Sequence, residues 1–317
     1  MNFSVLSDQF WALGLQGIAL GLVYSLVSLG YTMVYGVLRL INFANSEVFM
    51  LGTMATLVME EKIFHITTES EQIHGAKLLF VLGASLVASM VVCAVLAILV
   101  EIVAYRRLRA RGANRLASLI SAIGVSIFLM EGVRIITESK PLSAPRVLQK
   151  WSFGSLWGAD FRIDTVLSII VPIVVFFVLD RFVTKTRLGK SIRAVSMSEE
   201  NSKLMGININ RVITLTFCIG GITTGIASFI YTTVYENTVY KVGFTMGIAA
   251  FTAAVLGGIG NLRGAFYGGL ALGILEQFSS ALLGSQWKSV TVFVVLVVIL
   301  LFKPNGLFGE AVQQTRT

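Results

Sequence analysis

The chain has 317 residues, of which 55% are hydrophobic and only 13% are charged. Apolar runs long enough to cross a bilayer recur along it, which excludes a soluble globular domain and predicts a polytopic α-helical membrane protein. The formal net charge of +8 comes from short loops between apolar segments, so it indicates membrane orientation and not nucleic-acid binding.

Nine apolar segments follow one another along the chain. They are residues 10–37, 43–60, 78–105, 116–137, 165–183, 211–235, 245–260, 264–283 and 287–302. They predict an all-α fold, a single transmembrane domain over residues 1–317 with about eight or nine segments, some broken or re-entrant. The seventh segment would be about 24 Å long as a helix, whereas the hydrocarbon core of a membrane is about 30 Å thick. The sequence alone therefore leaves two alternatives, a full crossing and a partial one.

Two loops are densely basic, and they predict the orientation of the protein. They read YRRLRARGANR at 105–115 and DRFVTKTRLGKSIR at 180–193. The positive-inside rule places both loops in the cytoplasm. Two spans separate the loops, and an even number of spans returns the chain to the same side of the membrane. Residues 138–164 and the N-terminus are then expected outside, and the C-terminus inside, provided that the seventh segment crosses.

Two stretches of the chain have similar sequences. GLVYSLVSLGYTMVY at 21–35 and GITTGIASFIYTTVY at 221–235 both carry a glycine followed ten residues later by YT-x-VY. By the orientation above, the two helices run in opposite directions. This similarity therefore predicts an inverted-topology repeat, with a chance match as the alternative.

The second segment contains polar residues where lipid is expected. RLINFANSEVFMLG at 39–52 includes Glu47, and Glu276 is a second carboxylate inside an apolar segment. Ionised groups at this depth face a transport pathway or a buried partner, and both readings stay open. The glycine-rich LGGIGNLRGAFYGG at 256–269 predicts either a broken helix that lines the pathway or tight helix packing.

No motif for chemistry is visible. TKTRLGKS at 184–191 ends like a phosphate-binding loop, but it lacks the first glycine and follows a transmembrane helix instead of a strand. HExxH, paired-cysteine and GxSxG motifs are absent from the sequence. We therefore expect no catalytic residue, no metal and no cofactor bound by this chain.

The polar segment GKSIRAVSMSEENSKLMGININRV at 189–212 has a different character. It is rich in helix formers between Ser196 and Met205 and stops at Gly206, which predicts a short amphipathic helix with a glycine terminator. A solvated loop is the alternative. Such a helix before a new span looks like the EAA-type loop by which permeases of ABC importers dock on their ATPase subunits.

Five separated blocks extend this resemblance along nearly the whole chain. They are LGYTMVYGVLRLINFANSEVFMLG, LISAIGVSIFL, LMGININRVITLTF, AFTAAVLGGIGNLRGAFYGGLALGILE and KPNGLFG. Together they resemble the branched-chain amino-acid permease family of ABC transporters, most of all its H-type subunit. The family commonly has NFAHGE where this chain has Asn45 and Ser46 in the middle of the motif. This departure puts the ligand in doubt more than the transporter class.

The resemblance implies a multi-pass permease of the bacterial inner membrane that imports branched-chain or other aliphatic amino acids. Its partners would be membrane lipid, two cytoplasmic ATPases that hold ATP and Mg, a second, M-type permease and an extracytoplasmic solute-binding protein. A permease for urea or short amides and a stand-alone ion-coupled carrier are the alternatives. A membrane enzyme is disfavoured, because no catalytic cluster converges.

The same comparison supplies candidate sites. The expected ATPase-coupling loop covers residues 184–210, and its contact residues would be Ser198, Glu199, Glu200, Leu204, Met205 and Gly206. The expected substrate pathway would include Asn42, Phe43, Asn45, Glu47, Gly257, Gly258 and Glu276. A zwitterion with an aliphatic side chain needs polar groups at one end and an apolar surface at the other.

Overall fold

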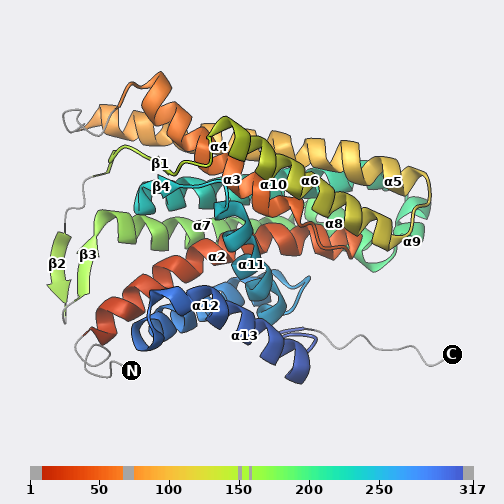
Figure 1. The fold of residues 1–317 in the computed structure, drawn as a ribbon. Helices are drawn as coiled ribbons and strands as arrows, with labels where there is room; N and C mark the ends of the chain where they lie inside the picture. Colours follow the sequence, from red (N-terminus) through yellow and green to blue (C-terminus); the bar gives the residue numbers. More distant parts are fainter. Residues whose placement is uncertain (1–8, 67–74, 149–151, 157–158, 310–317) are drawn as a thin grey trace.

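The computed structural model describes residues 9–66, 75–148, 152–156 and 159–309 as a bundle of helices (Figure 1). Seven helices in these ranges are long and apolar enough to cross a membrane. They are α2 (Phe10–Leu38), the continuous helix formed by α4 (Ala76–Val100), η2 (Glu101–Arg106) and α5 (Arg107–Ala110), then α6 (Arg115–Ile136), α7 (Ile163–Lys185), α10 (Ile209–Tyr235), α12 (Leu262–Leu283), and α13 (Lys288–Phe302), which the turn η3 (Ser285–Trp287) precedes.

Two shorter helices lie among them. They are α3 (Ala44–Val58), which the π-helical η1 (Met59–Ile63) extends, and α11 (Val242–Gly257), which is the apolar one of the two. Every apolar segment expected from the sequence is therefore helical, and the polytopic all-α fold is confirmed. The outward faces are apolar as well, since Leu79, Phe128 and Leu301 are each more than 70% exposed. Such faces suit contact with lipid.

The two ends of the bundle differ in structure (Figure 1). One end, here the strand end, carries two short antiparallel pairs, β1 (Leu142–Ser143) with β4 (Asn237–Thr238) and β2 (Ser152–Leu156) with β3 (Ala159–Arg162). The other, here the basic end, carries α5 and the two short helices α8 (Arg187–Met197) and α9 (Glu199–Leu204). For residues 138–164 the sequence predicts only the side of the membrane, so these strands were not expected.

Helix packing supports the predicted inverted repeat. The central helices α2 and α10 pack against each other, α2 packs against α11 and α12, and α10 packs against α3 and α4. Each short helix then contacts the helices that follow it, α3 with α4 and α6, and α11 with α12 and α13. The main contacts of the run α2–α3–α4–α6 thus correspond to those of the run α10–α11–α12–α13, although α2 and α10 run in opposite directions.

The two central helices also end in the same way. Arg39 after α2 and Glu236 after α10 are both left-handed, with φ of 51° and 54°, although neither is glycine. Their backbone N–H groups bond to Tyr35 O and Thr232 O, so each residue closes the last helical turn. This shared turn sends the chain into the short helices α3 and α11.

Candidate functional site

The polar segment at the basic end folds as two capped helices. The Thr186 hydroxyl caps α8 by accepting from Gly189 N at 3.0 Å, and the Ser198 hydroxyl caps α9 by accepting from Asn201 N at 3.2 Å. Because Ser198 is extended, with φ of −155°, it divides the segment. The short helix expected before Gly206 is therefore present, but it begins at Glu199 and not at Ser196.

The glycine terminator is confirmed. Gly206 has φ of +78°, its N–H bonds to Lys203 O at 3.0 Å, and Ile207 N bonds to Ser202 O at 3.0 Å. These two bonds form a Schellman motif, in which a left-handed residue satisfies the last carbonyl groups of a helix. The motif fixes the direction in which the chain leaves α9 and enters α10.

Large apolar side chains project from this segment. Met197, Leu204 and Met205 are 81%, 85% and 83% exposed. Of the other expected contact residues, Glu200 is exposed and Glu199 is half-buried. An apolar cluster at the polar end of a bundle marks a surface suited to a protein partner.

The segment that ends like a phosphate-binding loop has a packing role. Its residues join α7 to α8, two helices, where a phosphate loop would join a strand to a helix. A Cβ on Gly189 would lie 2.4 Å from the carbonyl oxygens of Phe182 and Val183. Glycine is therefore required there because the two backbones touch.

Glu47 is completely buried in α3. Its Oε1 accepts hydrogen bonds from the Ser46 hydroxyl at 3.3 Å and from the Ser126 hydroxyl of α6 at 3.2 Å. Its Oε2 has no hydrogen-bond partner among the described residues, and a Cβ on Gly243 of α11 would lie 2.7 Å from that oxygen. Glu47 thus sits in the contact between α3, α6 and α11.

The polar residues next to Glu47 connect α3 to its neighbours. The Tyr105 hydroxyl donates to Asn42 Oδ1 at 3.2 Å, and Asn45 Nδ2 donates to Thr224 Oγ1 at 3.2 Å. Phe43 is half-buried. These two amides tie α3 to η2 and α10.

The ring of Phe43 packs on Phe251 of α11, with centroids 6.1 Å apart. The four predicted pathway residues near the start of α3 therefore contact different neighbouring helices. The structure gives Asn42 and Asn45 bonded partners, whereas one oxygen of Glu47 keeps none among the described residues.

Glu276, in contrast, lines a cavity of about 420 Å³. The Tyr24 hydroxyl donates to its Oε2 at 2.8 Å, and Lys288 of α13 lines the same cavity. The remaining lining residues are two hydroxyl residues, Thr245 and Ser289, and an aromatic and aliphatic majority: Leu20, Tyr231, Tyr235, Phe244, Met246, Ile248, Ala249, Val292 and Phe293. One carboxylate, one ammonium and an apolar wall therefore meet in one space.

This set of groups can hold a zwitterion with an aliphatic side chain. The carboxylate of Glu276 suits an ammonium group, the ammonium of Lys288 suits a carboxylate, and the apolar wall suits the side chain. Sequence reasoning found Glu276 but missed Lys288. The available signal was that Lys288 is the only basic residue between Gly264 and Phe302.

The predicted glycine pair lies in the turn between α11 and α12. A Cβ on Gly257 would lie 1.9 Å from Gly264 O, and Gly258 has φ of +106°. The C-terminal segment 303–309 covers this turn, because Leu307 N bonds to Leu256 O at 2.8 Å and Phe308 N bonds to Gly257 O at 3.0 Å. Close backbone packing explains why both positions are glycine.

The sequence matches known proteins over almost its whole length. Residues 14–301 match the family described as branched-chain amino acid transport system / permease component. The high-affinity branched-chain amino acid transport system permease protein BraD of Pseudomonas aeruginosa is 38% identical over 298 residues, which are 93% of this chain and 94% of the relative. The permease protein LivH of Escherichia coli is 36% identical over the same shares. The ribose import permease protein RbsC of Haemophilus influenzae is 24% identical over 185 residues, 56% of this chain and 57% of that protein. No solved structure matches the chain.

Proposed function

This chain belongs to the branched-chain amino acid transport permease family, and from that membership we propose its cargo, its partners and its orientation in the membrane. It is a membrane-spanning permease subunit of an ATP-driven importer for branched-chain or other aliphatic amino acids. It is not an enzyme, and ATP hydrolysis belongs to separate subunits. The family match over residues 14–301 carries this conclusion, because it covers nearly the whole described bundle.

The orientation follows from the basic end. We place the protein in the bacterial inner membrane, with the basic end in the cytoplasm and the strand end outside. The concentration of Arg106, Arg107, Arg109 and Arg111 beside α8 and α9 supports this, since cytoplasmic ends of membrane helices are rich in basic residues. The start of α2 then lies outside, and the segment 303–309 lies inside.

The exposed apolar side chains of α8 and α9 support docking of an ATPase on this end. Met197, Leu204 and Met205 expose apolar surface, which gains free energy when a partner covers it. Two ATPases with bound ATP and Mg, a second, M-type permease and an extracytoplasmic solute-binding protein would complete the importer. A second copy of this chain is the alternative to the M-type permease.

The cavity at Glu276 and Lys288 is our candidate for the cargo site. Lys288 follows η3, and Tyr235 ends α10 next to β4, so the cavity belongs to the strand end. There it could receive an amino acid from a binding protein before the bundle changes conformation. We assign Glu47, Gly257 and Gly258 to the packing of the bundle, because each lies in a close contact between segments.

Reconstituted uptake tests the function. Liposomes that hold the assembled importer should accumulate leucine, isoleucine and valine only with ATP and with the binding protein, and unlabelled urea or acetamide should not compete. Preferred uptake of urea would assign the amide-permease alternative. Gradient-driven uptake of leucine by this chain alone, without an ATPase, would overturn the proposal in favour of a secondary carrier.

A substitution at Gly206 tests the coupling role of α9. Gly206→Val should abolish transport and ATPase docking while the protein still inserts, because a β-branched residue disfavours φ of +78° and the Schellman motif would be lost.

The matched control is Gly75→Val at the strand end. Gly75 has φ of +67°, and, as at Gly206, nothing lies within 4 Å of an added Cβ. This variant should dock the ATPases normally. Full uptake by Gly206→Val would contradict the coupling role, and equal loss in both variants would assign the effect to backbone strain alone.

A further inference from the structure

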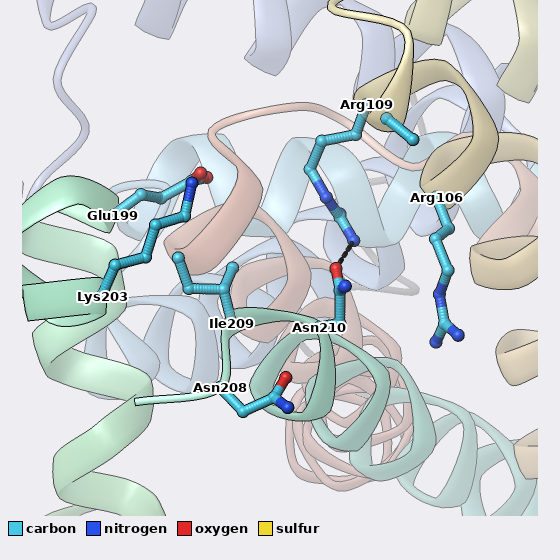
Figure 2. A pocket seen from close by; sticks show the side chains of 8 residues that line it. Arg106, Arg109, Glu199, Lys203, Asn208, Ile209 and Asn210 are labelled. Atoms are coloured by element: carbon cyan, nitrogen blue, oxygen red, sulfur yellow. Dashed lines mark hydrogen bonds between the residues drawn. The ribbon is translucent and has the colours of Figure 1, made fainter. Parts of the chain in front are cut away.

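A second cavity, of about 310 Å³, lies at the basic end between α5 and the α9–α10 connection (Figure 2). Arg106 and Arg109 line it from one side, and Lys203 and Glu199 of α9 line it from the other. Its volume lies at the lower end of the range for small-molecule pockets, about 300 to 1,000 Å³. Three cationic side chains against one carboxylate make it a site for an anionic group.

The two arginines are held in position by a buried carboxylate. Glu101, which is completely buried, accepts from Arg106 Nη2 at 2.7 Å and from Arg109 Nη2 at 3.3 Å. One carboxylate does not neutralise two guanidinium groups, so positive charge remains at the cavity.

One donor at this cavity is unused. Arg109 Nη2 also donates to Asn210 Oδ1 at 2.9 Å, as Figure 2 shows. Arg109 Nη1, however, is buried and has no hydrogen-bond partner within the described part of the chain. A buried donor without a partner is unfavourable, and an anionic oxygen in the cavity would satisfy it.

An apolar cavity of about 540 Å³ adjoins the cationic one. The two share Arg106, Asn208 and Asn210 as lining residues. The apolar cavity is otherwise lined from α4 and α10, by Ile98, Arg211, Thr214, Leu215 and Cys218. Ile98 lies about two helical turns before Arg106 in the same continuous helix. The apolar cavity therefore extends from the basic end toward the middle of the bundle.

We propose that the two cavities together bind one anionic phospholipid of the cytoplasmic leaflet. The phosphate would lie between Arg109 and Lys203, and an acyl chain would lie along Ile98, Leu215 and Cys218. Lipids combine an anionic head with an apolar tail, and basic pockets between transmembrane helices on the cytoplasmic side suit them. A free phosphate or an acidic peptide would fill only the cationic part.

The bound lipid would bridge two parts of the basic end. Arg109 belongs to the long helix that ends in α5, whereas Lys203 belongs to α9. A shared phosphate would tie α9 to that long helix, so lipid occupancy would change how α9 transmits movement from an ATPase. This consequence rests on the proposed coupling role of α9, but lipid binding itself does not.

Lipid retention tests the binding. The assembled importer is equilibrated with equal amounts of phosphatidylglycerol and phosphatidylethanolamine, delipidated in steps, and analysed by native mass spectrometry. The last retained lipid should be phosphatidylglycerol. Lys203→Gln should reduce this preference about fivefold, the effect of one basic residue at a lipid surface. The matched control Lys190→Gln, an exposed cation of α8, should not change it.

Two further measurements separate the lipid from other occupants. Cys218→Phe, which fills the apolar cavity without changing charge, should lower phosphatidylglycerol retention, while 10 mM inorganic phosphate should not displace the lipid. Displacement by phosphate, or retention unchanged by Cys218→Phe, would overturn the lipid assignment. If binding of the ATPases displaces the lipid, the cavity would be a site for an acidic segment of a partner. This result would also overturn the lipid assignment.

The transport readout is kept apart from the binding readout. Wild-type importer should take up leucine faster in liposomes with phosphatidylglycerol than in neutral liposomes, and Lys203→Gln should lose this difference while it keeps uptake in neutral lipid. No uptake under any condition would contradict the proposed function. Equal uptake in both lipids would contradict only the lipid effect.

Discussion

Glu47 and Glu276 are both carboxylates inside the bundle, yet their surroundings differ. Glu47 accepts hydrogen bonds from Ser46 and Ser126 in a packed contact between helices. Glu276 accepts from Tyr24 and lines a cavity of about 420 Å³ together with Lys288. Both side chains are buried, so burial alone does not distinguish a residue that meets cargo from one that holds helices together. The cavity and the opposite charge beside Glu276 make that distinction.

Among the variants that test this comparison, the largest effect is expected from Glu276→Gln. The amide keeps the shape of the side chain and can still accept from the Tyr24 hydroxyl, so assembly and stability should stay normal. Leucine uptake should fall about thirtyfold, because an ammonium group in the cavity would lose its charged partner, worth about 2 kcal/mol. Uptake at the wild-type rate with normal assembly would show that Glu276 does not bind cargo. The proposed difference between Glu276 and Glu47 would then be wrong.

The next effect is expected at Glu47 and should appear in stability. Glu47→Ala should lower the free energy of unfolding by about 1–3 kcal/mol, because the Ser126 hydroxyl would lose its buried acceptor, whereas the Ser46 hydroxyl still donates to Phe43 O. Glu47→Gln should be tolerated in stability and in uptake, since the amide oxygen can accept both bonds. Thermal unfolding in detergent and reconstituted uptake measure the two. Impaired uptake by a stable, assembled Glu47→Gln protein would place Glu47 in the pathway.

A smaller effect is expected from Lys288→Gln. Lys288 is half-buried, so water screens it more than it screens Glu276, and uptake should fall about tenfold. The Michaelis constant should rise more for leucine than for an amidated leucine, which has no carboxylate to bind. If both substrates lose equally, Lys288 supports the fold of α13 and does not bind a carboxylate.

The smallest effect is expected from Ser126→Ala. Ser126 supplies one of the two hydrogen bonds to Glu47, and its loss should cost about 0.5–1.5 kcal/mol. A double-mutant cycle with Glu47→Ala should give a coupling energy of the same size. Additive effects of the two substitutions would show that the bond between α3 and α6 contributes nothing to stability.

The sequence predicts the helices well because each long apolar run must bury its backbone in lipid as a helix. It also predicts Gly206 as a terminator, because few residues tolerate a left-handed turn. The break at Ser198 was missed, since the same residue type is common both in helices and at their caps. Lys288 was missed for another reason: its meeting with Glu276 depends on how α13 packs against α11 and α12, and no local pattern encodes that packing.

The contact between the segment 303–309 and the α11–α12 turn has a consequence for biosynthesis. The carbonyl groups of Leu256 and Gly257 receive their bonds from Leu307 and Phe308, which a ribosome makes about 50 residues later. During membrane insertion the turn between α11 and α12 therefore closes only after Leu307 and Phe308 have been made. A product truncated before Leu307 would reach the membrane with this turn still open, and a protease that recognises exposed backbone would then have a site to attack.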